Sequence, residues 1–145
     1  MSGIGATVLV VALAATAVAA WWLRTRNGTV RTVEDRDGTP QAALRRLGAV
    51  PEQADLTVVQ FSTAFCGPCR ATKARLQQLQ ATRPGLAVVQ VDAESHLDEV
   101  RELDVRRTPT LFYLDRSGVL LGRSSGAPRP DELTALVDAH TGVPS

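Results

Sequence analysis

The chain has 145 residues, which is room for one globular domain and an extension but not for two full domains. Its 16 basic and 15 acidic side chains give a formal net charge of +1, and without a basic stripe the sequence argues against nucleic-acid binding. The two cysteines are too few for a secreted fold held by several disulfides, and with His96 and His140 as the only other soft ligands no metal site is expected.

The N-terminal segment Ile4–Leu23 has no charged residue and is long enough, at about 1.5 Å per residue, to cross a bilayer core of about 30 Å. It ends near Trp21 and Trp22, and such aromatic residues favour the membrane interface. We therefore predict that residues 1–23 form an uncleaved, single-pass transmembrane helix. The alternative is a signal peptide cleaved at residues 17–19, but the segment before the apolar run lacks Lys and Arg.

The residues after the apolar segment are polar and rich in arginine. Residues 24–39 contain turn signals and are predicted to form a linker, in which Thr29–Val33 is a candidate edge strand. Because arginines follow the anchor and none precedes it, the positive-inside rule predicts a cytoplasmic C-terminal domain, with an extracytoplasmic one as the alternative. These arginines are Arg24, Arg26, Arg31 and Arg36.

Helical and strand patterns alternate from residue 40 to residue 145, which we predict to be one domain. Strands are predicted at Leu56–Phe61, Leu86–Val91, Thr110–Leu114 and Val119–Arg123. Helices are predicted at Gln41–Leu47, Cys69–Ala81 and Pro130–Ala139, with a further helix capped by Ser95. This order predicts an α/β fold with a central mixed sheet of four to five strands, flanked by helices on both faces.

Cys66 and Cys69 lie between a predicted buried strand and a predicted helix. The N-terminus of a helix has unpaired N–H groups and a partial positive charge, which stabilise a thiolate placed there. Three-residue spacing brings both sulfurs onto one turn, and Pro68 stiffens that turn. We therefore predict that Cys66 is the nucleophile and that Cys69 resolves the mixed disulfide. A pair of inert structural thiols is the alternative.

The segment Phe65–Arg70, which contains Gly67 between the cysteine pair, resembles the active-site segment of the thioredoxin family. The resemblance extends over about Leu56–Gly142. It implies a thioredoxin fold and an enzyme that reduces or exchanges protein disulfides. It also implies that the redox-active disulfide takes the place of a bound cofactor, and we expect a monomer.

A second resemblance lies at residues 107–110, which match the loop that carries the family's cis-proline. It implies that Pro109 faces the cysteine loop and that Thr108 offers backbone hydrogen bonds to an extended substrate. The Thr108 hydroxyl is expected to reach the Cys66 sulfur. Gly126 resembles a residue of the third loop of the family's substrate groove, where glycine permits close backbone approach.

The chain also departs from the family pattern. Phe65 stands where thioredoxins usually carry Trp, and aligning the strands puts Gln60 and Gln90 where the family has a buried Asp and a Lys. A neutral pair is therefore predicted in place of a buried ion pair, which removes the carboxylate that would accept a proton. Three arginines, predicted to border the groove, form either an electropositive rim or ordinary solvated surface: Arg70, Arg106 and Arg107.

Three functional hypotheses remain open at this point. The leading one is a membrane-anchored enzyme that acts on protein disulfides and is re-reduced by an upstream thiol reductant. The second is a non-enzymatic adaptor that binds extended peptides, which would not need both cysteines. The third is a relay that passes electrons or sulfur to one dedicated membrane partner.

Overall fold

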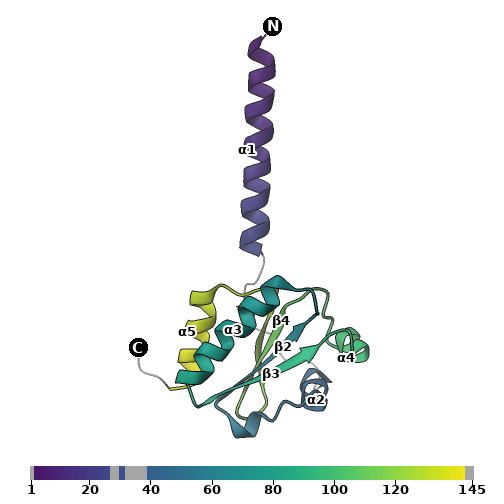
Figure 1. The fold of residues 1–145 in the computed structure, drawn as a ribbon, viewed down its shortest axis with the longest axis vertical. Coiled ribbons are helices and arrows are strands. Elements are labelled where there is room, and N and C mark those ends of the chain that lie inside the picture. The colour runs from purple at the N-terminus through teal and green to yellow at the C-terminus, as the bar shows by residue number, and fades with distance from the viewer. Residues whose placement is uncertain (1, 27–29, 32–38, 143–145) are drawn as a thin grey trace.

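The computed structural model describes residues 2–26, 30–31 and 39–142 (Figure 1). Its first element is the long helix α1 (Ser2–Arg26), which continues past the predicted end of the apolar segment at Leu23. A domain built from a mixed sheet and several helices follows it. Much of the predicted linker 24–39 lies outside the described residues.

Within the described residues, five strands form one sheet in the order β1-β5-β4-β2-β3. Strands β2 and β3 run parallel and the other neighbouring strands run antiparallel, so the predicted mixed sheet is confirmed. The strands are β1 (Val30–Arg31), β2 (Leu56–Ser62), β3 (Leu86–Asp92), β4 (Thr110–Asp115) and β5 (Leu120–Ser125). The candidate edge strand Thr29–Val33 is represented by β1 alone, because its other residues lie outside the described ones.

Helices cover both faces of the sheet, as the alternation of patterns predicts. They are α2 (Thr39–Arg46), α3 (Gly67–Thr82), α4 (Leu97–Glu102) and α5 (Pro130–His140), with a short 3-10 helix, η1, at Pro51–Gln53. Helix α3 contacts α5 and strand β3, whereas α2 contacts α4. Figure 1 shows α3 and α5 side by side, with α2 and α4 away from them. The sheet is therefore the middle layer of three.

The two helix layers enclose two separate apolar cores, because successive side chains of a strand point to opposite faces. Leu56 and Val58 of β2 belong to the core under α3 and α5. Val59 and Phe61 belong to the core under α2 and α4, where the Phe61 ring meets Phe112 edge-on at 5.8 Å. Residue 60 therefore points to the α3 side, toward the first turn of that helix.

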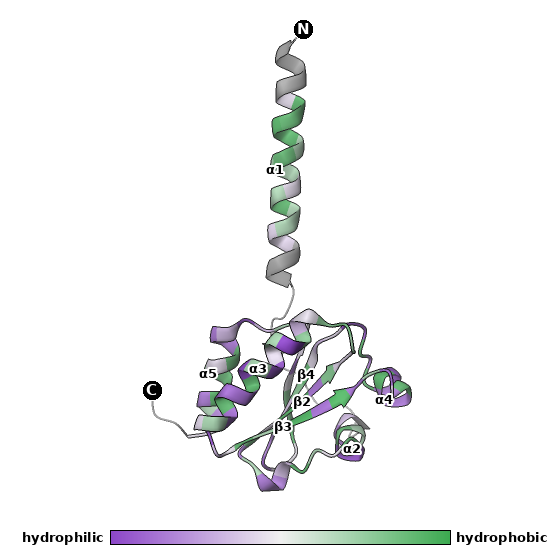
Figure 2. Ribbon diagram, viewed as in Figure 1, coloured by the Kyte–Doolittle hydropathy of each residue, from purple (hydrophilic) through white to green (hydrophobic). Residues whose placement is uncertain are grey.

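The part of helix α1 that Figure 2 colours is mostly hydrophobic. The large hydrophobic residues between Val8 and Trp22 are between 50% and 68% exposed. Among the residues that the structure describes, however, no helix is both long enough and apolar enough to cross a membrane. The transmembrane helix predicted at Ile4–Leu23 is thus not confirmed.

Two local predictions differ from the structure. Ser95 does not cap α4: its hydroxyl donates instead to Asp92 Oδ2 at 2.6 Å, and His96 occupies the cap position without a side-chain cap bond. The helix expected to begin at Cys69 begins at Gly67, because the Cys66 sulfur itself caps it. Both differences arise from side chains that bind nearby backbone or side-chain groups, which periodicity does not report.

Candidate active site

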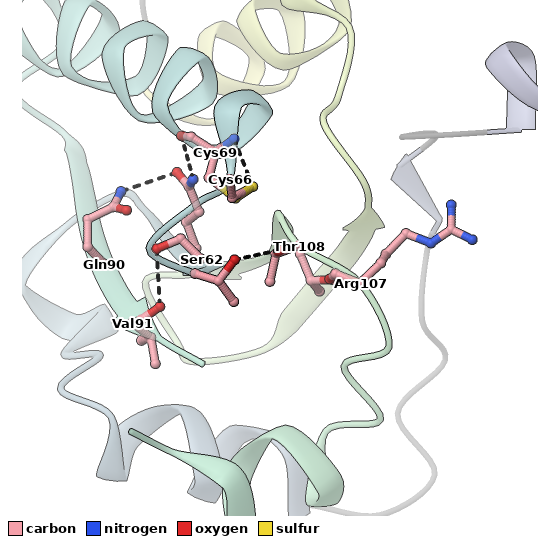
Figure 3. The surroundings of a disulfide bond; sticks show 10 residues. Ser62, Cys66, Cys69, Gln90, Val91, Arg107 and Thr108 are labelled. Carbon is pink, nitrogen blue, oxygen red and sulfur yellow. Dashed lines mark hydrogen bonds between the residues drawn. A yellow bond between two sulfur atoms is a disulfide. The ribbon is translucent and has the colours of Figure 1, made fainter. Parts of the chain in front are cut away.

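The two cysteines lie at the junction of strand β2 and helix α3 and are joined by a disulfide bond (Figure 3). Cys66 is the N-cap of α3 and Cys69 is in its first turn, with Cα atoms 5.2 Å apart. Cys66 is 8% exposed and Cys69 is 3% exposed, whereas the neighbouring Phe65 is 98% exposed. The pair therefore lies just beneath the surface, and Cys66 is the more exposed of the two cysteines.

The backbone of α3 points hydrogen-bond donors at Cys66. The Cys69 N–H donates to the Cys66 sulfur at 3.2 Å, and the Arg70 N–H donates to the Cys66 carbonyl oxygen at 3.3 Å. An N–H group at a helix N-terminus stabilises negative charge on the atom that it faces. When the disulfide is reduced, this arrangement favours a thiolate at Cys66 over one at Cys69.

Two glutamines lie behind the cysteine pair. Gln60 is fully buried, and its Nε2 atom donates to the Cys69 carbonyl oxygen at 3.0 Å. Gln90 Nε2 donates to Gln60 Oε1 at 3.2 Å (Figure 3), and the register of β2 and β3 pairs the two residues directly. The neutral pair predicted at these two positions is present. A chain of neutral hydrogen bonds thus runs from Gln90 to the turn that carries Cys69.

The predicted loop at residues 107–110 is joined to the loop that contains Gly126 by a backbone hydrogen bond. The Thr108–Pro109 peptide bond is cis, and the Gly126 N–H donates to the Pro109 carbonyl oxygen at 2.8 Å. Gly126 has a φ of +98°, a conformation that L side chains rarely adopt. Figure 3 shows Thr108 below the turn that carries Cys66. The Thr108 hydroxyl oxygen lies 3.4 Å from Thr63 Oγ1. The contact observed for this hydroxyl is therefore with Thr63, not with the cysteine sulfur as expected.

A polar pocket of about 320 Å³ opens beside Cys69. Two cationic side chains, Arg70 and Lys73, line it together with the Asp92 carboxylate. Hydrogen bonds from the Ser95 hydroxyl and the Glu94 N–H lower the pKa of Asp92 below its ordinary value, so this group is ionised near neutral pH. The lining residues are Ser62, Thr63, Cys69, Arg70, Lys73, Gln90, Val91 and Asp92.

Sequence reasoning named Cys69, Arg70 and Gln90 among these lining residues, in other roles, and did not name Lys73 or Asp92. Two available signals could have found them. Lys73 lies four residues after Cys69, which is one helical turn. Asp92 pairs with Ser62, two positions beyond the Gln60–Gln90 pair in the β2–β3 register.

The predicted arginine rim is only partly realised. Arg106 forms an ion pair with Asp104 at 2.7 Å, which offsets its charge. Figure 3 shows the Arg107 side chain extending away from the disulfide. The cations that the structure places beside the cysteines are therefore Arg70 and Lys73, on α3 itself.

Comparison with known proteins agrees with this geometry. The family model for thioredoxin matches residues 48–139, which contain both cysteines, Pro109 and Gly126. The chain belongs to the thioredoxin family. Among its thioredoxin relatives, it is 30% identical to thioredoxin of Pongo abelii over 83 residues, which cover 57% of this chain and 77% of that protein. It is 24% identical to thioredoxin H4-1 of Oryza sativa subsp. japonica over 117 residues, which cover 79% of this chain and 86% of that protein.

Solved thioredoxin structures share the fold. The X-ray structure of Fasciola hepatica thioredoxin has a TM-score of 0.57 and 27% identity, covering 68% of this chain and 92% of that one. The oxidised form of mitochondrial thioredoxin 3 from Saccharomyces cerevisiae has a TM-score of 0.56 and 27% identity, covering 66% of this chain and 89% of that one. Thioredoxin family membership and the paired cysteines together identify the chain as an enzyme, a thiol–disulfide oxidoreductase.

Proposed function

We propose that this member of the thioredoxin family reduces or exchanges protein disulfides through a mixed disulfide, with Cys66 as the attacking residue and Cys69 as the resolving one. The observation that carries the assignment is the hydrogen bond from the Cys69 N–H to the Cys66 sulfur, 3.2 Å long, at the start of α3. The greater exposure of Cys66 supports the same order. The reverse order would require the more buried cysteine to meet the substrate first.

The cycle moves two electrons to the substrate. The Cys66 thiolate attacks one sulfur of a substrate disulfide, which forms a bond to that sulfur and releases the other as a thiolate that takes up a proton. The Cys69 thiol then gives up its proton and attacks the Cys66 sulfur, which forms the Cys66–Cys69 disulfide and releases the second substrate thiol. An upstream dithiol reductant reverses these steps to regenerate the enzyme, and no bound cofactor takes part.

We propose that the substrate disulfide lies in an extended segment that binds along the Thr108 and Gly126 backbones. The bond between Gly126 and Pro109 joins the two loops. The exposed ring of Phe65, next to Cys66, offers an apolar contact to the same segment. Main-chain hydrogen bonds of this kind bind many sequences with little selectivity, which suits an enzyme with several protein substrates.

A turnover assay tests the enzymatic function. The full chain is given an excess of dithiothreitol and a protein substrate whose disulfide reduction can be followed. We expect Cys66→Ser to lower turnover at least about 100-fold, because it lacks the attacking thiolate, and Cys69→Ser to lower it less, because dithiothreitol can release its mixed disulfide. Ser117→Ala, in the turn between β4 and β5, is a control expected to retain full turnover. Undiminished turnover in Cys66→Ser would overturn the proposal.

We propose further that α1 attaches the enzyme to a membrane. Its large hydrophobic residues between Val8 and Trp22 are exposed and lie on all sides of the helix, a pattern typical of helices surrounded by an apolar medium. The Thr16 hydroxyl is satisfied within the helix, by the carbonyl oxygen four residues back at 2.8 Å. Trp21 and Trp22 are followed by Arg24 and Arg26, an order that suits a membrane interface and favours a cytoplasmic domain.

Attachment and sidedness can be measured separately. Flotation of the full chain with lipid vesicles tests attachment, and recovery of the chain only in the aqueous fraction would contradict it. For sidedness, a cysteine-free chain carrying Ser117→Cys is exposed to an impermeant maleimide in intact cells. We expect labelling only after lysis, whereas ready labelling without lysis would place the domain outside.

A further inference from the structure

We infer that the end of the domain carrying the Cys66–Cys69 disulfide faces the membrane, so that its substrates are disulfides close to the bilayer surface. The inference deepens the proposed function and rests on the attachment of α1 to a membrane. It is carried by an independent observation, the place at which the chain joins the sheet. Within the predicted linker, β1 (residues 30–31) is held on the sheet by its pairing with β5.

The chain joins the sheet at one end of its outer strand. Strand β1 pairs antiparallel with β5, Val30 opposite Ser124 and Arg31 opposite Arg123. Strand β5 runs toward Ser125, so β1 begins at the end where β5 finishes and runs away from it. Val30, the first residue of β1, therefore lies at the Ser125 end of the sheet.

That end of the sheet is the end that carries the active site. Val30 pairs with Ser124, Ser124 with Leu111, and Leu111 with Gln60, so these four positions form one row across the strands. Gln60 is the residue whose side chain holds the Cys69 carbonyl oxygen. With neighbouring strands about 4.8 Å apart, Val30 lies about 14 Å from Gln60 across the sheet.

The substrate loops lie between these two positions. Gly126 follows the end of β5 and binds the Pro109 carbonyl oxygen, and Pro109 directly precedes β4. Strands β5 and β4 separate β1 from β2 in the sheet. A line drawn from the start of β1 to Cys66 thus passes over the loops that would hold the substrate.

The tether between α1 and β1 is short. Helix α1 ends at Arg26 and β1 begins at Val30, which leaves four Cα–Cα steps and a reach of at most about 15 Å. Figure 1 shows α1 above the end of the domain at which α3 begins. The far end of the sheet, at the β4–β5 turn, is about 20 Å further away, since β4 has six residues at about 3.4 Å each.

The short tether limits which substrate disulfides can reach the groove. An attachment point within about 15 Å of Val30 holds the groove of Cys66, Pro109 and Gly126 next to the lipid headgroups. Disulfides in membrane-embedded or membrane-bound proteins, near the bilayer surface, can enter a groove in that position. Disulfides on large soluble proteins would be hindered by the bilayer itself.

Depth-dependent quenching tests this orientation. A cysteine-free full chain (Cys66→Ser, Cys69→Ser) carries either Phe65→Cys or Ser117→Cys, labelled with a fluorophore and reconstituted in vesicles with a headgroup quencher. Both positions are exposed, at opposite ends of the sheet. We expect at least about twofold stronger quenching at position 65, given the separation of about 20 Å. A matched chain with about twelve Gly and Ser residues inserted after Asn27 should lose most of the difference, because the longer tether is flexible.

The outcomes separate this inference from the proposals on which it rests. Equal quenching at the two positions in vesicle-bound chains, or stronger quenching at position 117, would overturn the orientation while leaving attachment intact. Chains that do not float with vesicles would overturn the attachment and, with it, the orientation. Neither result alters the soluble turnover assay, which tests the disulfide chemistry alone.

Discussion

Gln90 and Gln60, paired across the parallel strands β3 and β2, share a hydrogen bond of 3.2 Å from Gln90 Nε2 to Gln60 Oε1. Gln60 Nε2 in turn donates a hydrogen bond to the carbonyl oxygen of Cys69. Two amides cannot accept a proton near neutral pH. Gln60 is buried whereas Gln90 is exposed, and a neutral Gln60 avoids the cost of burying a charge, which is several kcal/mol per ion. The enzyme therefore lacks a carboxylate at position 60 to deprotonate Cys69 as it resolves the mixed disulfide.

Replacing Gln60 with Asp should change both the stability and the pH dependence of this step. The carboxyl group would be buried beside an uncharged Gln90, which destabilises its ionised form. We expect a free energy of unfolding lower by about 1–3 kcal/mol, because the Cys69 carbonyl oxygen loses its donor. We also expect resolution about tenfold faster near neutral pH, since a general base now lies close to Cys69.

Stopped-flow reduction of a model disulfide between pH 5 and 9 measures this effect. In the parent protein, the rate of resolution should rise with pH without an inflection from a buried carboxylate. Gln60→Asn is the matched control, since it shortens the side chain without adding a titratable group, and should show no new inflection. A carboxylate-like inflection already in the parent, with an unchanged rate in Gln60→Asp, would show that another group accepts the proton.

Gly126 is predicted to tolerate no side chain without cost. Its φ of +98° and its hydrogen bond to Pro109 fix the backbone that borders the groove. Gly126→Ala should lower the free energy of unfolding by about 1–2 kcal/mol and reduce turnover of a protein disulfide more than that of a small disulfide. Urea unfolding measures the first effect, and Gly67→Ala, whose new Cβ would meet nothing within 4 Å, should leave stability nearly unchanged. Equal losses in the two variants would contradict this explanation.

Tyr113 should make the fold sensitive to alkali. Burial, opposed by the hydrogen bond with Ser124 and reinforced by the charge of Glu132, raises the pKa of Tyr113 to about 12. Because the folded pKa lies above the ordinary value of about 10, the tyrosine's contribution is fully present below pH 10 and is lost between pH 10 and 12. We expect a loss of about 2 kcal/mol over this range.

Urea unfolding of the parent and of Tyr113→Phe between pH 7 and 11.5 tests the assignment. The variant should be less stable by about 1 kcal/mol at pH 7, because Ser124 loses its partner, and should show a smaller decline in alkali. An identical alkaline decline in both proteins would assign the effect to other groups.

Much of the domain could be predicted from the sequence because local patterns and tertiary packing agree there. The apolar runs at Leu56 and Leu86 form strands whose register places Gln90 opposite Gln60, although only the first of the two strands is buried throughout most of its length. The cysteine motif lies between β2 and the start of α3, and the Thr108–Pro109 peptide bond is cis, as the thioredoxin resemblance implied. Each of these features depends on residues close in sequence or on a strand order that the family shares.

The remaining features depend on contacts between distant segments. The pairing of β1 with β5 joins residues more than ninety positions apart, and the sequence of a two-residue strand does not indicate which strand it pairs with. Arg106 pairs with Asp104, and the Ser95 hydroxyl binds Asp92. Each side chain has several polar neighbours in the sequence, and the sequence does not indicate which of them it contacts. The side chains that line the pocket beside Cys69 likewise come together only after the sheet and α3 are packed.

Trapping of mixed disulfides tests the central claim, the order of attack at the cysteine pair, most directly. The full chain is prepared as Cys69→Ser and as Cys66→Ser, reacted with a protein disulfide and separated without reductant. In Cys69→Ser the Cys66 thiolate can attack but nothing resolves the product, so we expect a mixed disulfide to accumulate that dithiothreitol releases. Cys66→Ser should trap nothing, because its remaining thiol is buried at the first turn of α3. Accumulation in Cys66→Ser with none in Cys69→Ser would contradict the account.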